Sequence, residues 1–285
     1  MKTRFHIPKN IQGNLAYKGR NLRSLSGYDL TFVFENFNRL QRKGKPDVTV
    51  AIPAYNEEEK LFATLRSLSL QQTALNVEFL LIDNNSTDRT AEMAWKCGIT
   101  VLKETKQGVA NARELALQKA QGAILVSCDA DTIYPPQWLD TLVKPLQVKA
   151  EVSATYSLHC LYDETGNYPF SLYAYQYAKL GYTLMRSGKR GQLNCGGASM
   201  AFRTEQAKKV GGYKTTLVRG EDGFLALQLR RFGAIAMVKS ANAFIYTSNR
   251  RMLNDGSILN AFTIRAAYGM RHFFSFFSNQ KIPTA

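Results

Sequence analysis

The sequence predicts an α/β fold with a mostly parallel β-sheet that carries helices on both faces. Short apolar runs rich in β-branched residues alternate along the chain with stretches whose apolar residues recur at helical spacing. Polar turn formers separate the two kinds of segment, and 45% hydrophobic residues in a chain of 285 suffice for a sizeable core. Strands that alternate with helices build βαβ units, whose successive strands run parallel.

The alternation is clearest in the first half of the central region. The pattern predicts strands at residues 48–52, 77–83, 99–102 and 123–129. It predicts intervening helices at residues 60–70, 88–97 and 109–119. We therefore expect a Rossmann-like half domain of four βα units at residues 48–131.

The segments that follow are less regular and predict a mixed arrangement. Strands are expected at residues 152–156, 198–203 and 234–238. Helices are expected at residues 135–148, 168–186, 204–210, 223–232 and 257–278. We therefore divide the chain into a basic N-terminal extension (1–47), one main domain (48–248) with halves 48–131 and 132–248, and a basic, aromatic C-terminal helix (249–285).

Charge is distributed unevenly between these parts. The formal net charge is +15, of which residues 1–47 carry +7 and residues 249–285 carry +4. Basic ends favour an anionic neighbour such as lipid head groups or a diphosphate, although they would also serve only to keep the chain soluble. The nearly balanced centre argues against a nucleic-acid-binding module, which would interleave basic and aromatic residues over one face.

Composition and spacing exclude several further classes. No run of about 18 uncharged apolar residues occurs, which excludes a polytopic membrane protein. The first residues lack the apolar stretch of a secretory signal, and the four cysteines form no CxxC pair. We therefore expect a cytoplasmic protein with free thiols and without a zinc site.

Polar side chains follow the predicted strands at the points where they end. Asp83 closes the strand at 77–83, and Asp129 and Asp131 close the strand at 123–129. Alternation in an extended segment would put Asp129 and Asp131 on one face, where like charges are unfavourable unless a cation or a donor lies between them. Mg²⁺ or Mn²⁺, held by one or two carboxylates and diphosphate oxygens, would fit there, although a helix cap and a turn would also explain the pair.

Taken together, six segments in order resemble the family 2 glycosyltransferases of the GT-A fold. They are VTVAIPAYNEE, LLIDNNSTDRT, GVANARELAL, LVSCDAD, NCGGASMAFR and VRGEDGFLALQLRRFG, and they lie between residues 48 and 246. The resemblance implies that residues 48–131 bind a nucleotide sugar and that residues 132–248 bind the acceptor. It also implies a metal-dependent transferase of the hexosyltransferase class that takes part in glycan, polysaccharide or glycolipid synthesis, with a UDP-sugar as the commonest donor.

The resemblance assigns roles residue by residue. In the donor half it implies a first loop that grips the base and ribose, made of Pro53, Ala54, Tyr55 and Glu57. It implies that Asp83 binds the base and that Arg113 lies near the diphosphate. It also implies a D-x-D motif, formed by Asp129, Ala130 and Asp131. Asp129 would face the ribose and the sugar, and Asp131 would bind the metal directly. In the acceptor half, Glu221 and Asp222 match the acidic motif, with Asp222 as the general base.

Elementary chemistry agrees with this assignment. An inverting transfer needs a carboxylate that takes a proton from the acceptor hydroxyl during attack on the anomeric carbon. On the opposite face of the anomeric carbon it needs a metal ion that neutralises the charge of the leaving diphosphate. Asp222 lies at the start of the predicted helix at 223–232, and we expect the dipole of that helix to keep it ionised.

Three alternatives remain at this stage. A nucleotidyltransferase would carry a Gly-rich basic loop after the first strand, where this chain has PAYNEEE, and a dinucleotide-dependent dehydrogenase would carry G-x-G-x-x-G. A non-catalytic nucleotide-sugar-binding protein would need neither Asp131 nor Asp222. We expect a lipid-linked acceptor. For the basic segments 1–47 and 249–285 we expect peripheral docking on the inner membrane face, with packing on the domain or dimer formation as the alternatives.

Overall fold

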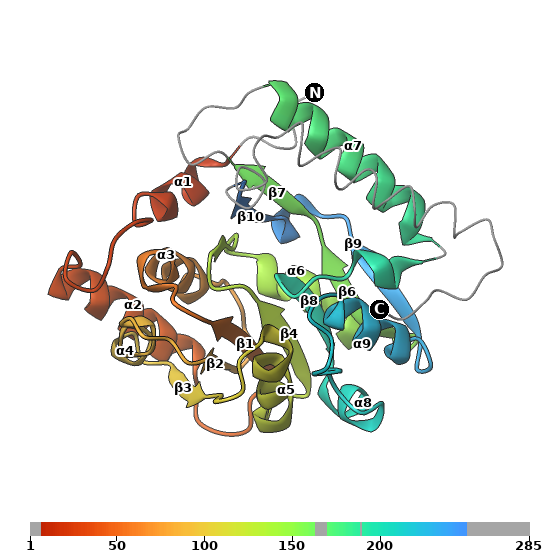
Figure 1. Cartoon of the computed structure of the whole chain (residues 1–285), viewed down its shortest axis with the longest axis horizontal. Coiled ribbons are helices and arrows are strands. Elements are labelled where there is room, and N and C mark those ends of the chain that lie inside the picture. Colours follow the sequence, from red (N-terminus) through yellow and green to blue (C-terminus); the bar gives the residue numbers. More distant parts are fainter. Residues whose placement is uncertain (1–6, 163–169, 189, 250–285) are drawn as a thin grey trace.

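The computed structural model describes residues 7–162, 170–188 and 190–249, and the arrangement of their helices and strands is shown in Figure 1. The C-terminal helix predicted at 257–278 lies outside the described residues. None of the helices that the structure describes is both long and apolar enough to cross a bilayer.

One seven-stranded sheet forms the centre of the molecule, in the order β3-β2-β1-β4-β8-β6-β9. Its strands, in that order, are Thr100–Lys103, Val77–Asp83, Val48–Ala54, Ile124–Cys128, Ser199–Arg203, Val152–Ser157 and Ala234–Val238. β3, β2, β1 and β4 run parallel, whereas β8 is antiparallel to both β4 and β6. The predicted mostly parallel sheet with a mixed second half is confirmed.

Helices cover both faces of this sheet, as predicted. One face packs against α2 (Gly27–Leu40), α3 (Glu58–Ser69), α4 (Thr90–Lys96) and α6 (Trp138–Val148). The other packs against α5 (Val109–Lys119), α8 (Thr204–Lys209) and α9 (Glu221–Leu229). Because side chains of β1 alternate between the faces, Val50 and Ile52 enter the first layer and Ala51 enters the second.

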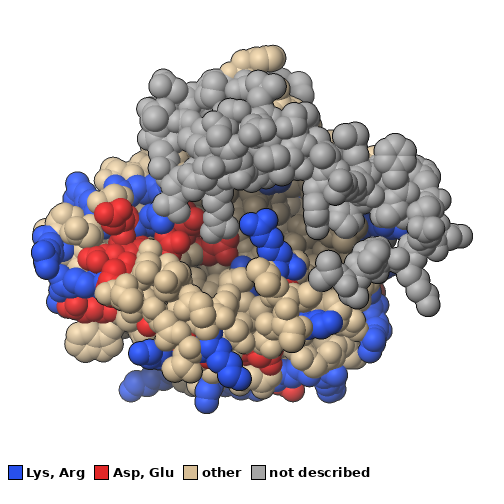
Figure 2. All heavy atoms as spheres, viewed as in Figure 1, with Lys and Arg blue, Asp and Glu red and all other residues tan. Residues whose placement is uncertain are grey.

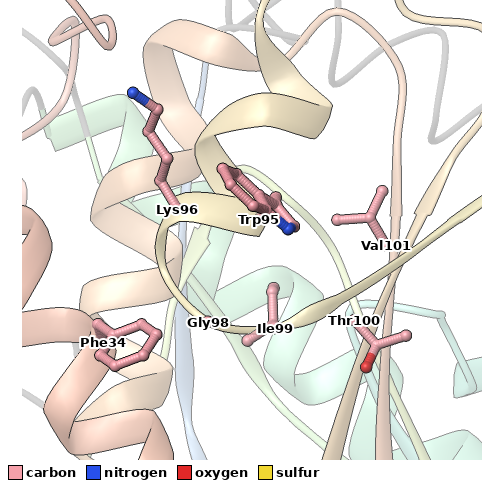
Figure 3. Close-up of a pocket in the computed structure, with 7 residues that line it drawn as sticks. All are labelled: Phe34, Trp95, Lys96, Gly98, Ile99, Thr100 and Val101. Carbon is pink, nitrogen blue, oxygen red and sulfur yellow. The ribbon is translucent and has the colours of Figure 1, made fainter.

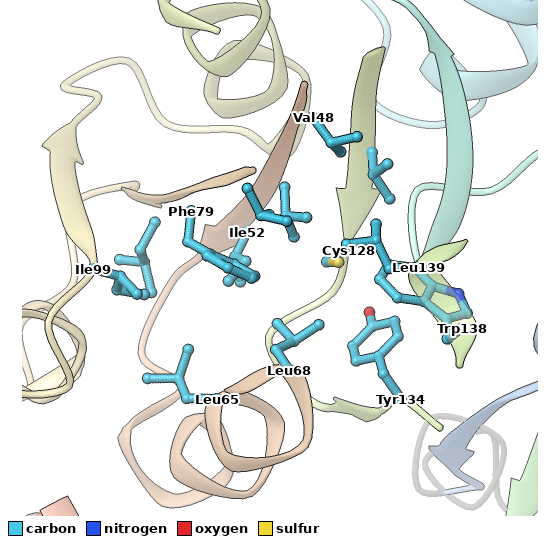
Figure 4. Close-up of a cluster of buried hydrophobic side chains, with 14 of the residues drawn as sticks. Val48, Ile52, Leu65, Leu68, Phe79, Ile99, Cys128, Tyr134, Trp138 and Leu139 are labelled. Carbon is cyan, nitrogen blue, oxygen red and sulfur yellow. The ribbon is translucent and has the colours of Figure 1, made fainter. Parts of the chain in front are cut away.

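The larger core lies between the sheet and the first group of helices (Figure 4). Phe79 on β2 and Phe37 on α2 meet edge to face, with ring centroids 4.7 Å apart, and both are fully buried. α2 begins with a capping box, in which Ser26 and Asp29 satisfy each other's backbone N–H groups. Residues before the first strand therefore contribute a complete helix to the core.

A smaller sheet, in the order β5-β10-β7, is built from strands of the second half, 132–248. Its strands are Thr132–Ile133, Ile245–Ser248 and His159–Tyr162. It packs against α1 (Lys9–Leu15), and α7 (Phe170–Ser187) packs on β7. Two 3₁₀ turns, η1 (Gly191–Asn194) and η2 (Ala241–Ala243), complete the fold; η1 follows α7 and contacts α9.

Candidate functional site

The carboxyl ends of β1, β2 and β4 lie at one edge of the sheet, and the loops that follow them contain the predicted donor residues. β1 and β2 pair in register, so that Ala54 lies opposite Asp83. Asp83 is buried, and its Oδ1 accepts a hydrogen bond of 3.2 Å from the backbone N–H of Ser86. Pro53 is half-buried in β1, whereas the ring of Tyr55 is half exposed. Tyr55 therefore has the exposure that stacking on a base requires.

Glu57 has a local partner within the first loop. Its carboxylate pairs with Lys60 at 2.5 Å, one turn further along α3. Its backbone N–H donates to Thr90 Oγ1 at 2.9 Å, which ties the loop to α4. The structure thus gives Glu57 a visible part in holding the loop.

Asn84 is a positioning residue that the sequence analysis did not assign. Its side-chain amide donates to the carbonyls of Glu104 and Lys106, at 3.1 and 2.7 Å, and accepts 2.7 Å from the N–H of Gly108. Gly108 is the N-cap of α5 and has φ +129°, a conformation that favours glycine. Asn84 therefore fixes the start of the helix that carries Arg113.

The turn that contains Asp129 and Asp131 is clamped from the core. The hydroxyl of Tyr134 accepts 2.9 Å from the N–H of Asp129 and donates 3.0 Å to the carbonyl of Ala198. Thr64 of α3 donates 2.8 Å to the carbonyl of Ala130. Both clamping side chains are fully buried, so that this turn is held by groups that do not themselves face a ligand.

Arg113 connects the first half of the main domain to the second. The guanidinium donates through Nη2 to Asp129 Oδ1 at 3.2 Å, and through Nη1 to Asp222 Oδ2 at 2.7 Å and to Glu221 Oε1. Its side chain is only 7% exposed. Burial by itself would lower the pKa of Arg113, but Asp222 and Asp129 raise that pKa above its ordinary value, so the group stays charged. Of the predicted residues, Arg113, Asp129, Glu221 and Asp222 are thus brought into one cluster.

Gly197 completes this cluster from the backbone. Its N–H donates to Asp222 Oδ2 at 2.8 Å. A Cβ added at this position would lie 1.8 Å from Arg113 Nη2, so only glycine leaves room for the guanidinium. Gly196 and Gly197 immediately precede Ala198 and β8. Because Ser199 of β8 pairs with Cys128 of β4, the two glycines lie near Asp129, the residue after Cys128.

Asp222 is the most perturbed acid of the cluster. Burial raises its pKa to about 6, helped by Glu221 and Asp129 and opposed by Arg113 and the Gly197 N–H. The expected helix dipole is thus outweighed by burial, yet a pKa of about 6 still leaves roughly ten ionised carboxylates for each protonated one at pH 7. Within the described residues, Oδ1 of Asp222 is buried without a hydrogen-bond partner. This oxygen can accept a proton.

Hard oxygen ligands suited to a divalent cation are present at Asp129 and Asp131. Asp131 is 9% exposed and accepts 3.3 Å from Thr132 Oγ1, whereas the Asp129 side chain is 27% exposed. No group of three or more His, Cys, Asp or Glu side chains positioned for a metal occurs in the described part of the chain. Two carboxylates without further protein ligands fit a cation that takes its other ligands from phosphate and water.

The charge of the surrounding edge agrees with this fit. α3 starts with Glu58 and Glu59 directly after the β1 loop. In Figure 2 acidic side chains gather on the side of the molecule where α3 and α4 lie, while Lys and Arg are spread around the periphery. An acidic edge repels a diphosphate unless a cation intervenes.

A pocket of ≈ 680 Å³ lies elsewhere (Figure 3). It is lined by Phe34 of α2, Trp95 and Lys96 of α4, and the residues 98–101 that lead into β3. None of the predicted site residues lines it, so it is separate from the Arg113 cluster.

Comparisons with known proteins agree with this architecture. The chain is 30% identical over 128 residues to a dolichol-phosphate mannosyltransferase of Pyrococcus furiosus (43% of this chain, 36% of that protein). It is 31% identical over 117 residues to an undecaprenyl-phosphate 4-deoxy-4-formamido-L-arabinose transferase of Serratia proteamaculans (38% and 36%). The matched stretches therefore span about a third of these relatives' own length.

A solved structure supports the fold. A mannosyltransferase from Pyrobaculum calidifontis, in complex with GDP-Man and Mn²⁺, superposes with a TM-score of 0.55 at 21% identity (90% of this chain, 74% of that chain). Residues 49–211, more than half of the chain, match the model described as glycosyl transferase family 2. The sheet order, the structural likeness and the matched residues together show that the chain belongs to glycosyl transferase family 2 and has the GT-A fold.

Proposed function

We propose that this protein is an inverting glycosyltransferase that moves a sugar from a nucleotide-diphosphate sugar, with a UDP-sugar as the first candidate, to an acceptor hydroxyl. The observation that carries the proposal is the cluster around Arg113. It joins the D-x-D turn at the end of β4 to the acidic start of α9, and it leaves one buried carboxylate oxygen of Asp222 unpaired. A base beside a donor site is the arrangement that an inverting transfer requires.

Asp222 has the properties of the general base. With a pKa of about 6, it is ionised at neutral pH and still basic enough to accept a proton while the acceptor hydroxyl attacks. Gly197 and Arg113 hold Oδ2, so that Oδ1 is left for the acceptor. Glu221 shares Arg113 with Asp222 and is the second carboxylate of the acceptor side.

In the donor site, residues of the first half would hold the nucleotide. Tyr55 would stack on the base, with Pro53, Ala54 and Glu57 in the same loop, and Asp83 would accept a hydrogen bond from the base. Asp131, assisted by Asp129, would hold Mn²⁺ or Mg²⁺, which when bound would neutralise charge on the leaving diphosphate. Arg113 already pairs with Asp129, Glu221 and Asp222, so we assign it to positioning these acids and not to contact with the diphosphate.

The acceptor is proposed to be lipid-linked, in glycan or polysaccharide synthesis. Support comes from two similar proteins, one named a dolichol-phosphate mannosyltransferase and the other an undecaprenyl-phosphate 4-deoxy-4-formamido-L-arabinose transferase. In this proposal residues 48–131 bind the donor and residues 132–248 bind the acceptor.

A thermal-shift panel of UDP- and GDP-sugars, with Mn²⁺ or with chelator, tests the donor assignment. A donor at a hundred times its Kd stabilises by about 2.7 kcal/mol, or roughly 5–10 °C for a chain of this size. We expect one nucleotide class to stabilise only with the cation. If no nucleotide sugar stabilises the protein under either condition, the proposed function is wrong.

A further inference from the structure

Tyr213 brings a buried phenol to the region around Arg113. It follows α8, is 3% exposed, and packs its ring against Phe202 of β8 with ring centroids 6.3 Å apart. It belongs to the core layer on the second face of the sheet, to which α9 contributes Leu225. Asp222 lies three residues before Leu225, on the same side of that helix. Tyr213 therefore shares a layer with the face of α9 that carries Asp222.

The backbone at Tyr213 is held by the neighbour of Arg113 in the sequence. Glu114 Oε2 accepts 2.7 Å from the N–H of Tyr213. Gly212 has φ +69°, and a Cβ at this position would collide with the same carboxylate, so only glycine fits there. Because Arg113 and Glu114 are consecutive residues of α5, the helix that carries the guanidinium also sets the position of the phenol.

Buried polar atoms without a partner gather in this region. Among the residues that the structure describes, the hydroxyls of Tyr213 and Ser127 and Nε of Arg113 are buried and accept or donate no hydrogen bond. Ser127 of β4 faces the same layer, because Leu125, two residues earlier in the strand, lies in that layer. A buried hydroxyl without a partner costs stability that a phenylalanine ring would not.

The charges of the cluster act on this phenol. Burial raises the pKa of Tyr213 above its ordinary value and the charge of Asp222 raises it further, whereas Arg113 and Ser127 lower it. The phenol therefore stays neutral, and its oxygen remains able to accept a hydrogen bond. Arg113 has a donor to offer, because Nη1 and Nη2 hold the three acids and Nε holds none of them.

We propose that Tyr213 is a positioning residue for Arg113, and that its hydroxyl accepts a hydrogen bond from Nε of Arg113 when Asp222 loses its charge. The moment of action rests on the proposed function. In that transfer the proton of the acceptor hydroxyl passes to Asp222, while the acceptor oxygen bonds to the anomeric carbon and the nucleoside diphosphate leaves.

The loss of charge at Asp222 explains why such a bond is needed. A neutral Asp222 attracts the guanidinium less than an ionised one, whereas Asp129 and Glu221 keep their attraction. The bond to Tyr213 would keep Arg113 beside Asp222, so that the carboxyl group stays aligned during the proton transfer. Bonds of this kind are often unmade in the free enzyme and form only as the reaction proceeds.

A double-mutant cycle in urea tests the inference without any substrate, because Asp222→Asn imitates the uncharged acid. In the wild-type background, Tyr213→Phe should leave the unfolding equilibrium constant within about twofold, since the hydroxyl has no partner there. In the Asp222→Asn background, the same change should raise that constant at least about fivefold, the effect of losing one buried hydrogen bond.

Tyr17→Phe is the matched control. Its hydroxyl donates 2.9 Å to Asp29 on the first face of the sheet, so its loss should raise the unfolding constant by the same factor in both backgrounds. Two results would overturn the inference. They are an equal effect of Tyr213→Phe in both backgrounds, and a rise of about fivefold or more in the wild-type background, which would make the hydroxyl purely structural.

The transfer rate gives a second, independent test. With a nucleotide sugar that stabilises the protein, Tyr213→Phe should lower kcat about tenfold or more and leave the donor KM unchanged, because the bond forms only during the reaction. Tyr17→Phe should keep the wild-type kcat. An unchanged kcat in Tyr213→Phe would refute the inference alone. If Asp222→Asn also keeps its rate, the proposed base is wrong, and the cycle in urea still decides whether Tyr213 meets Arg113.

Discussion

Replacing Arg113 by Met removes the positive charge that pairs with Asp129, Glu221 and Asp222. At about 4 Å and an effective dielectric constant of about 20, each ion pair is worth roughly 4 kcal/mol before desolvation. Desolvation cancels much of this sum, and breaking a buried pair typically costs about 3–5 kcal/mol. We therefore expect Arg113→Met to lower the free energy of unfolding by about 3–5 kcal/mol near pH 8.

The deficit should depend on pH in a definite direction. Arg113 lowers the pKa of Asp222, so its loss moves that pKa further above about 6 and further above the unfolded value. A raised folded pKa means that stability is present below the unfolded pKa and is lost as pH rises through the folded pKa. The variant should therefore regain part of its stability near pH 5, where Asp222 becomes protonated.

Urea unfolding at both pH values measures this effect. Arg89→Met is the matched control, because it removes an arginine that pairs with Glu92 in a partly exposed ion pair on α4. It should unfold like wild type at either pH. A loss below about 1 kcal/mol in Arg113→Met, or a deficit that does not shrink near pH 5, would refute the electrostatic account of the cluster.

The other predictions concern turnover and nucleotide binding. Asp222→Asn should lower the transfer rate about 10²–10⁴-fold with donor binding retained, and the acidic limb near pH 6 should disappear from the rate profile; if most of the rate persists, Glu221 is the base. Asp131→Asn should abolish the Mn²⁺ dependence of nucleotide stabilisation in a thermal-shift assay, and full wild-type activity in excess chelator would contradict the role of the metal. Gly197→Ala should displace Arg113 and abolish turnover, whereas Gly196→Ala, whose Cβ would lie 3.7 Å from His159, should remain active in the same assay.

Most of the main sheet could be predicted because its strands are continuous apolar runs. β1, β2 and β4 are buried on both faces, so their sequences carry the signal without help from context. β5, β7 and β10 could not be found, because a two-residue strand such as Thr132–Ile133 exists only through its pairing with β10. The place of Phe37 in the core could not be predicted either, because its contact with Phe79 joins two segments that are distant in the sequence.

The candidate site divides in the same way. Asp129, Asp131 and Asp222 stand in recognisable local patterns, whereas two of the three carboxylate partners of Arg113 lie 108 and 109 residues away. No sequence pattern marks the hydroxyl of Tyr134 or the amide of Asn84, which act on backbone groups of neighbouring loops. Local patterns therefore singled out these acids and Arg113, whereas the tertiary structure was needed to show that Arg113 contacts three of the acids.

The arrangement around Arg113 has a consequence for the order of events in the site. One guanidinium neutralises an acid of each half, so a change in the charge of Asp129 alters what remains for Glu221 and Asp222. A cation beside Asp129 would weaken the hold of that carboxylate on Arg113 and strengthen the pairing of Arg113 with the acceptor-side acids. The pKa of Asp222 would then fall, which would keep the proposed base ionised when the donor is in place. The two halves of the site would thereby be coupled through one side chain, for which Gly197 leaves the space.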